Sequence, residues 1–463
     1  MASASRFAWE AAKPVTKSAP ILRRAGLFTR EQGGFVLMCG VILLIGLLLL
    51  QKFGVPFGDD AVQICLPITY GAILFLMVVT QKVGVDLKRL MLFGVFATLA
   101  VAVNVLPNKN YSSSSLLLVL AIYFPFVFRY YVPQATYKRL MNLYVDAALV
   151  IVALVIVQHL IQVSTSYTNW PNLDKIAPED FLVRNYNYLQ VIKYGLNYMK
   201  PNAIFLLEAS FVSQYIALGL IIELIFFGRI GRLLLLVAGL LLSFGGTGLV
   251  LVGACAPFLV FRMSPRVLII AIILAIATAV AAVETGWYQQ VSHRVTEYQS
   301  SASSSHARFI SPFGALVDFF ARPDPLFGGD GAGQVPQTLA VLYWPVTKLT
   351  IEYGLVTTVA FFAFFLYSLF GDGGHLRIGF ALFIFYNFLS GSLAVPVNAL
   401  TCLFFCTLFR VANPPPPLAP RRQQRRPQPP PAGRPEPSPA GAAAPAMAPV
   451  TDLAEPPSPD TAG

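Results

Sequence analysis

A carboxylate stands in an apolar segment near the middle of the chain. Glu208 follows Lys200 and Pro201 and lies within an apolar run that continues to Phe227. We expect a helix from Ala203 to Phe227 that contains Glu208. A charged side chain in a bilayer costs roughly 3 kcal/mol or more, so this one should face protein or water rather than lipid. Glu208 is therefore a candidate functional group, and pairing with an arginine is the alternative interpretation.

Cations and aromatic rings are interleaved in the polar stretch 164–202, which precedes this carboxylate. They are Lys175, Arg184, Lys193 and Lys200, with Trp170, Tyr186, Tyr188, Tyr194 and Tyr198. Rings stack on the faces of sugars and cations neutralise phosphate, so the mixture suits a substrate that is part sugar and part phosphate. An aromatic belt at a membrane surface, with lysines that keep the loop soluble, would have the same composition.

A second polar stretch, 284–345, adds three arginines and a glycine-rich turn. The arginines are Arg294, Arg308 and Arg322. Arg308 precedes an amphipathic stretch, 309–320, which we expect to lie along the membrane surface, where arginine also snorkels for purely structural reasons. The turn 328–333 could bring backbone N–H groups close to an anion, although an ordinary loop has the same composition.

Lys348 and Glu352 follow this stretch, one helical turn apart. Side chains at positions i and i+4 lie on the same side of a helix, so the two can form an ion pair. A structural pair is the simpler interpretation, and substrate binding by Lys348 is the alternative. No metalloprotease, nucleophile-elbow, phosphate-loop or Asp-x-Asp motif is present, so we expect neither a metal nor another cofactor.

The composition predicts how these residues are positioned. Apolar residues make up 56% of the 463 residues and charged residues 12%, and the mean hydropathy is +0.65. Runs of about 20 apolar residues can cross a bilayer. We therefore expect an all-α polytopic integral membrane protein with about twelve transmembrane helices and two large outside loops that contain short interfacial helices. The expected spans are 35–50, 61–80, 90–105, 115–128, 143–163, 203–227, 233–244, 249–261, 267–283, 346–370, 378–390 and 397–409.

Basic residues predict the orientation of these spans. The expected inside loops carry Lys82, Lys88, Arg89, Arg129, Lys138, Arg139, Arg229, Arg232, Arg262, Arg266 and Arg377. This pattern obeys the positive-inside rule only if two doubtful segments, 233–261 and 378–409, are each split into two helices. Both termini are then cytoplasmic, and the large outside loops are 164–202 and 284–345.

Three regions follow from this organisation. A basic cytoplasmic arm, 1–32, precedes a transmembrane domain, 33–412, and a Pro/Ala-rich tail, 413–463, is expected to be disordered. Much of the net charge of +11 lies in the two terminal segments, so it does not indicate a nucleic-acid partner. All five cysteines lie in apolar segments and are expected to pack as small apolar residues.

The candidate residues also carry a family resemblance. Lys200-Pro201-Asn202, followed by Phe205, Glu208, Ser210, Phe211, Ser213 and Gln214, resembles the Arg/Lys-Pro-Asn…Glu-Pro-Ser-Phe…Ser-Gln stretch of bacterial exopolysaccharide polymerases of the Wzy type. The turn 245–248 resembles the Ser-x-Thr/Ser-x-Gly turn of the wider O-antigen ligase/polymerase group. Arg308, the stretch 325–333 and the segment 352–355 follow that group's order Arg…Pro-x-x-Gly-x-Gly…Glu-x-Gly-Leu.

Two departures bear on the choice within that group. Ala209 stands where the family frequently has proline. The His-Asn-x-x-Leu segment that is typical of ligases is replaced by Leu342-Tyr343-Trp344-Pro345. The second departure favours a polymerase over a ligase.

The resemblance implies an activity. Such a protein would polymerise polyprenyl-diphosphate-linked oligosaccharide repeat units into an exopolysaccharide or O-antigen chain at the periplasmic face of the inner membrane, without a metal or a nucleotide sugar. Glu208 and Arg308 would be catalytic. Substrate binding would fall to Arg184, Lys200, Arg294, Arg322, Lys348, Tyr194 and Tyr198. Implied partners are the lipid-linked oligosaccharide, membrane lipid and other assembly or export proteins, such as a chain-length regulator and a flippase.

Three alternatives remain at this point. A ligase would use the same donor and a different acceptor, and a transporter or flippase would move the same lipid-linked sugar. The middles of the expected spans are almost uncharged apart from Glu208 and Glu223, which disfavours a transporter. A structural subunit of a synthesis or export complex, with the Pro-rich tail as its contact, is the third.

Overall fold

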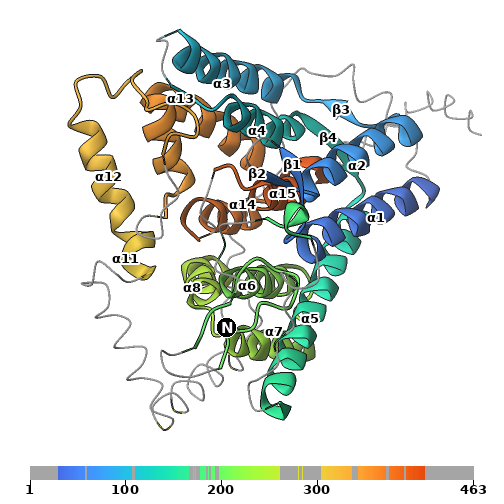
Figure 1. The fold of residues 1–463 in the computed structure, drawn as a ribbon. Helices are drawn as coiled ribbons and strands as arrows, with labels where there is room; N and C mark the ends of the chain where they lie inside the picture. The colour runs from blue at the N-terminus through green and yellow to red at the C-terminus, as the bar shows by residue number, and fades with distance from the viewer. Residues whose placement is uncertain are drawn as a thin grey trace, which may run out of the picture. The chain divides into compact units, whose positions relative to one another are not determined.

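The computed structural model describes most of the hydrophobic part of the chain (Figure 1). The described residues are 30–57, 60–106, 110–165, 170, 173, 178–183, 186, 189–192, 198–260, 269, 280, 284, 304–335, 342–371, 375–389 and 393–411. The chain divides into two units, Met1–Asn413 and Pro414–Gly463, and only the first contains described residues. The predicted disordered tail, nearly all of the basic arm and nearly all of the expected span 267–283 lie outside them.

The described part is mostly helical and contains five helices that are long and apolar enough to cross a membrane. They are α1 (Arg30–Leu44) continued by the π-helix η2 (Ile45–Leu49), α3 (Leu87–Val105), α5 (Gln134–Ser164), α6 (Ala209–Phe226) and α13 (Pro345–Phe370). Helix α5 begins nine residues before its predicted start at 143, so Lys138 and Arg139 belong to the helix and not to a loop.

Shorter helices complete the described part. They are α2 (Cys65–Thr80), α4 (Ser113–Tyr123) with η3 (Phe124–Val127), α7 (Ile230–Leu242), α8 (Gly246–Val260), α14 (Leu376–Ile384) with η7 (Phe385–Leu389), and α15 (Pro396–Cys402) with η8 (Leu403–Leu408). Each of the two doubtful segments is therefore two separate helices. The second polar stretch contains α11 (Ser304–Phe309) and α12 (Ser311–Phe320), and the described residues of the first include the helical turn η5 (Glu179–Phe181). The total of twelve spans remains a prediction.

Two small sheets depart from the all-α prediction. Strands β1 (Gly54–Phe57) and β2 (Asp60–Gln63) form an antiparallel hairpin. In the second sheet, β4 (Phe128–Val132) lies between β3 (Gly84–Val85), which is antiparallel to it, and β5 (Phe409–Val411), which is parallel. These strands are only two to five residues long and lie next to helix ends, so no run of alternating hydrophobicity identifies them in the sequence.

Buried arginines hold the three-stranded sheet to the helices around it. Asp86 is the N-cap of α3 and accepts hydrogen bonds from the Lys88 and Arg89 amides. Arg89 is fully buried, and its Nη1 lies 3.1 Å from the Thr407 carbonyl oxygen and 3.4 Å from that of Phe126. Charge-assisted hydrogen bonds of this kind are about twice as strong as neutral ones. We call this part of the molecule, where α3 and α5 begin, the basic end.

Helices α5 and α6 pack closely and run in opposite directions between the basic end and the candidate site. The absence of a side chain at Gly219 permits the contact, because a Cβ there would lie 2.7 Å from the Ala148 Cβ. The Tyr144 hydroxyl donates to the Tyr215 carbonyl oxygen at 3.0 Å. With 31 residues, α5 is about 46 Å long. This length exceeds the roughly 30 Å hydrocarbon core of a bilayer, so the two ends of α5 can lie on opposite sides of a membrane.

Candidate functional site

Three polar side chains at the C-terminal end of α5 hold the segment that enters α6. Gln162 forms two hydrogen bonds with the Met199 backbone, donating from Nε2 to the carbonyl oxygen at 3.0 Å and accepting from the amide at 2.7 Å. Gln158 donates to the Asn202 Oδ1 atom at 2.8 Å. Both glutamines are buried. Their spacing fixes residues 199–202 against α5.

His159 forms the third of these contacts, with Tyr198. The two rings are stacked with their centroids 5.6 Å apart, and the Tyr198 hydroxyl lies within hydrogen-bonding distance of His159 Nδ1. His159 Nε2 lies 2.8 Å from the Leu242 carbonyl oxygen, which can only accept. The arrangement therefore assigns the proton to Nε2, so that neutral Nδ1 accepts from Tyr198. One of the predicted sugar-binding rings is thus oriented by a histidine.

The start of α6 differs from the prediction. Glu208 is the N-cap of a helix that begins at Ala209, and not a residue within the helix. Asn202 explains the difference, because its Oδ1 accepts from the Ile204 amide at 3.0 Å and stabilises a turn in place of the helix. Ala203 and Ile204 then adopt φ values of 51° and 66°. Positive φ is strained for a residue with a Cβ and especially for a β-branched one.

Glu208 lies where the first polar stretch meets α6. Its carboxylate is partly exposed and accepts a hydrogen bond from the Ser210 hydroxyl at 2.9 Å. Negative charge is favourable at a helix N-terminus. The partly buried Tyr186 ring packs edge-to-face against Phe211, with centroids 6.1 Å apart. Loss of solvent raises the pKa of Tyr186 above its usual range, and the nearby Glu208 carboxylate raises it further.

The turn between α7 and α8 packs against the first turns of α6. The Ser213 hydroxyl donates to the Ser210 carbonyl oxygen at 2.8 Å and accepts from the Gly248 amide at 3.1 Å. A Cβ on Gly245 or Gly248 would collide with Ser213. The hydroxyl of Ser213 is therefore used to join α6 to the glycine-rich turn. This close approach is the physical reason for glycine at both positions.

The second glycine-rich stretch, 325–333, lies against a break in α13. Gly354 has φ of 81° and ψ of 166°, which interrupts the helical hydrogen bonding. Backbone groups of the loop replace those bonds. Leu355 and Val356 donate to the Pro325 and Leu326 carbonyl oxygens at 3.1 Å each, and the Ile351 and Glu352 carbonyl oxygens accept from Asp330 and Gly331 at 2.8 and 3.1 Å. Two pieces of the family-like order, 325–333 and 352–355, therefore lie in direct contact.

Lys348 and Glu352 form the expected ion pair. Lys348 Nζ lies 3.5 Å from Glu352 Oε1, and both side chains are buried. The backbone amides of Gly333 and Val335 also hydrogen-bond the Glu352 carboxylate. The Gly333 amide of the glycine-rich stretch therefore binds an anion of the protein itself, the Glu352 carboxylate.

Arg322 is held by groups from its own loop. It forms an exposed ion pair with Asp330, and its guanidinium lies 5.1 Å from the centre of the Phe319 ring. Asp324 is used in a turn, where it accepts from the Phe327 amide at 3.4 Å. Exposed ion pairs contribute little to stability, so Arg322 can exchange Asp330 for another anion at small cost.

The structure therefore places the predicted site residues in two groups. Lys200, Tyr198 and Glu208 belong to the segment held by α5, while Lys348 and Arg322 lie at the α13 break. The π-helix η7 connects the groups, because Leu389 accepts from Gln214 at 3.0 Å and Asn387 accepts from the Val346 amide at 3.3 Å. No hydrogen bond or ion pair described for these residues joins Glu208 to Lys348 directly.

The remaining predicted site residues are described in part or not at all. Arg184, Tyr194 and Arg294 lie outside the described residues. Arg308 belongs to α11, and the Ala307 carbonyl oxygen accepts from the Leu342 amide at 2.9 Å, which ties α11 to the segment entering α13.

The sequence interpretation missed the role of α5. His159, Gln158 and Gln162 lie in the last turns of an apolar helix, and together they position the entry to α6. Polar residues at i, i+1 and i+4 in the last turns of an apolar helix were the available signal.

No family model, curated protein or solved structure matches this chain. Across the described residues, no group of three or more His, Cys, Asp or Glu side chains could hold a metal ion. The class of protein that the structure defines is a mostly helical chain with helices suited to a membrane.

Proposed function

We propose that this chain is a membrane polysaccharide polymerase, which joins polyprenyl-diphosphate-linked oligosaccharide repeat units at the periplasmic face of a bacterial inner membrane. In this proposal both termini are cytoplasmic, and the segment 198–208 and the α13 break face the periplasm. The observation that carries the proposal is the geometry of Glu208. A partly exposed carboxylate stands at the N-terminus of an apolar helix and follows, in the sequence, the polar stretch 164–202 and its family-like Lys200-Pro201-Asn202 segment.

The chemistry is a glycosyl transfer. The acceptor hydroxyl of one repeat unit attacks the anomeric carbon of the growing chain, the carbon–oxygen bond to the diphosphate breaks, and polyprenyl diphosphate leaves. Glu208 orients the acceptor hydroxyl and takes its proton. The departing diphosphate carries the negative charge, which fixed cations stabilise best in a water-poor site. Arg308 is the first candidate for this role, followed by Arg184, Arg294 and Lys200, and Lys348 and Arg322 would bind substrate.

The aromatic residues would hold sugar. Tyr198 has a fixed orientation because His159 stacks on it and accepts a hydrogen bond from its hydroxyl. Preorganised side chains lose less entropy on binding than mobile ones. Tyr194 would add a second ring from the same stretch.

Reconstitution tests the proposal directly. The purified full-length protein is incubated in proteoliposomes with lipid-linked repeat units, and the products are separated by size. We expect a ladder from the wild type, no high-molecular-weight product from Glu208→Ala or Arg308→Ala, and normal product from the exposed-lysine control Lys88→Gln. All variants should remain in the membrane fraction. Normal polymer from both alanine variants would contradict the site assignment.

The same assay separates the alternatives. A ligase would transfer glycan to a different acceptor without extending the chain, and a flippase would move the donor across the bilayer without changing its size. A structural subunit would produce no product from any variant unless another protein were added. Each of these results would contradict the polymerase proposal.

A further inference from the structure

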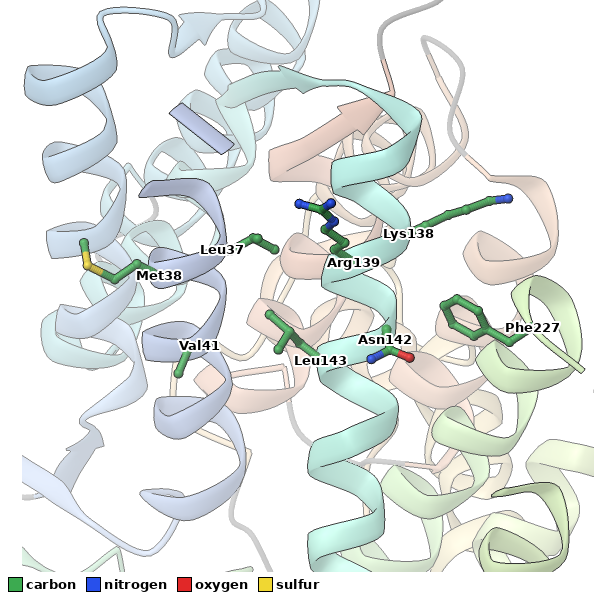
Figure 2. Close-up of a pocket in the computed structure, with 8 residues that line it drawn as sticks. All are labelled: Leu37, Met38, Val41, Lys138, Arg139, Asn142, Leu143 and Phe227. Atoms are coloured by element: carbon green, nitrogen blue, oxygen red, sulfur yellow. The ribbon is translucent and has the colours of Figure 1, made fainter. Parts of the chain in front are cut away.

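An apolar groove lies over one face of α5 at the basic end, away from the candidate site (Figure 2). Its volume is about 530 Å³, within the range of small-molecule sites. The apolar walls are Leu37, Met38 and Val41 from α1, Leu143 from α5 and Phe227 from the end of α6. The groove is open along one side, and Met38 and Val41 are exposed. In a bilayer this surface faces acyl chains.

Two cations stand on the α5 side of this groove. Lys138 and Arg139 are exposed, and neither forms an ion pair in the part of the chain that the structure describes. Figure 2 shows Arg139 directed toward α1 beside Leu37, and Lys138 extended on the side of Phe227. An apolar groove with one cation directed toward α1 and a second cation on the other side of the same helix is complementary to a molecule with an anionic head and apolar tails.

Two other arginines at the basic end, Arg229 and Arg232, are paired with acidic side chains. Arg229 donates two hydrogen bonds to the buried Glu223 carboxylate, at 2.8 and 2.6 Å, and a third to Asn142 at 2.7 Å. Arg232 is paired with Asp146. The acidic side chains therefore neutralise the arginines beside the groove and leave Lys138 and Arg139 for an external anion.

The groove and the candidate site lie at opposite ends of α5. Arg139 and Gln158 are 19 positions apart on one uninterrupted helix, which corresponds to about 28 Å. This distance is close to the thickness of the hydrocarbon core of a bilayer. A ligand in the groove is therefore in the other leaflet from a ligand at the candidate site.

We propose that this groove binds an anionic phospholipid, with its phosphate at Arg139 beside Leu37 and an acyl chain along Leu37, Val41 and Leu143, while Lys138 adds positive charge from the other side of α5. Basic pockets between transmembrane helices on the cytoplasmic side bind anionic head groups in this way. The N-terminal arm is a less suitable occupant, because Arg23 and Arg24 give it the same charge as the edge of the groove. The proposal is independent of the polymerase function.

Native mass spectrometry of the purified full-length protein tests the proposal. The protein in detergent is titrated with dioleoyl phosphatidylglycerol or with dioleoyl phosphatidylcholine, which has the same tails and no net charge. We expect a preference of about tenfold or more for phosphatidylglycerol, since each basic residue contributes to binding an anionic head group. The double variant Lys138→Gln/Arg139→Gln should lose this preference, and Lys88→Gln, with an exposed lysine elsewhere, should keep it.

A second pair of variants tests the apolar walls. Val41→Trp fills the groove and should reduce phosphatidylglycerol binding about tenfold, while Val78→Trp, on an exposed face of α2, should not. Equal binding of the two lipids, or unchanged binding by the double variant, would overturn the proposal. So would tighter binding of undecaprenyl diphosphate than of phosphatidylglycerol, or phosphatidylglycerol binding that appears only after residues 1–29 are removed.

Discussion

The two ends of α5 use their polar residues in different ways. At the basic end, charged side chains hold regular elements together, as Arg89 does with the ends of α3, η3 and η8. At the candidate site, neutral polar side chains hold backbone that is not helical, as Gln158 does with Asn202. The contacts at the basic end stabilise helices and strands whose backbone conformation is already favourable. The contacts at the candidate site maintain the positive φ of Ala203 and Ile204, which would otherwise relax.

This difference indicates where the molecule stores strain. Two consecutive residues with positive φ and a Cβ cost of order 1–3 kcal/mol each. Such backbone persists only where the surroundings determine it, and here the glutamines of α5 and the side chain of Asn202 do so. Strained backbone next to a partly exposed carboxylate is typical of functional sites, while the basic end has the properties of a structural support.

The largest effect is expected at the basic end. Arg89→Met removes a fully buried cation and leaves Asp86 and the Thr407 carbonyl oxygen without this partner. Breaking a buried charge pair costs about 3–5 kcal/mol, so the variant should be degraded or should melt well below the wild type. Size-exclusion chromatography and thermal melting in detergent measure this. A wild-type melting temperature would show that the basic end is not the structural support.

The second effect is expected at the α13 break. Gly329→Ala places a Cβ against the Glu352 carbonyl oxygen, which is backbone and cannot rotate away. We expect a loss of about 1–3 kcal/mol, since overpacking of this kind moves the surrounding structure. The matched control is Gly94→Ala in α3, where a Cβ would meet no atom within 4 Å. Equal melting temperatures for the two variants would contradict the docking of the loop on α13.

The buried ion pair of α13 is tested by the coupling energy between its two residues. Lys348→Met and Glu352→Gln should each destabilise the protein, because each leaves the partner charge buried alone. The double variant should be more stable than the sum of the two losses predicts, by about 1–3 kcal/mol. Thermal melts of the four proteins complete the cycle. Strictly additive losses would show that the two residues do not interact.

The smallest effect on stability is expected from Ile204→Gly. Glycine adopts positive φ without strain, and this gain should offset the removal of a partly buried side chain. The net change in the free energy of unfolding, measured by thermal melting, should be less than about 1 kcal/mol. A large destabilisation would show that the Ile204 side chain, and not the backbone turn, determines the structure of the entry to α6.

Apolar runs and basic residues predicted much of the helical framework. The split at Gly245 followed from the positions of Arg229 and Arg262, and the structure contains two helices, α7 and α8. All five cysteines are buried and free, as their apolar surroundings indicated. Periodicity succeeds here because burial in a helix depends on local apolar content.

The candidate site was less predictable because its geometry depends on contacts between distant residues. The helix expected to begin at Ala203 does not form there, because Asn202 stabilises a turn and is itself held by Gln158. These two residues are 44 positions apart, so no local sequence pattern predicts their contact. The role of His159 depends on Tyr198 in the same way. Hydrophobicity cannot distinguish a glutamine that faces lipid head groups from one that holds a buried segment of backbone.

The break in α13 also affects how the chain can be assembled. The backbone groups freed at Gly354 have lost their helical hydrogen bonds and need other partners. These partners, Pro325 and Leu326 for the amides and Asp330 and Gly331 for the carbonyls, precede α13 in the chain and are synthesised first. The loop in turn rests on Asn104 and Ser112, which are made still earlier. The loop that supplies these hydrogen bonds can therefore be in place when α13 is made. If the loop docked late, the backbone groups of α13 around Gly354 would lack partners during membrane insertion.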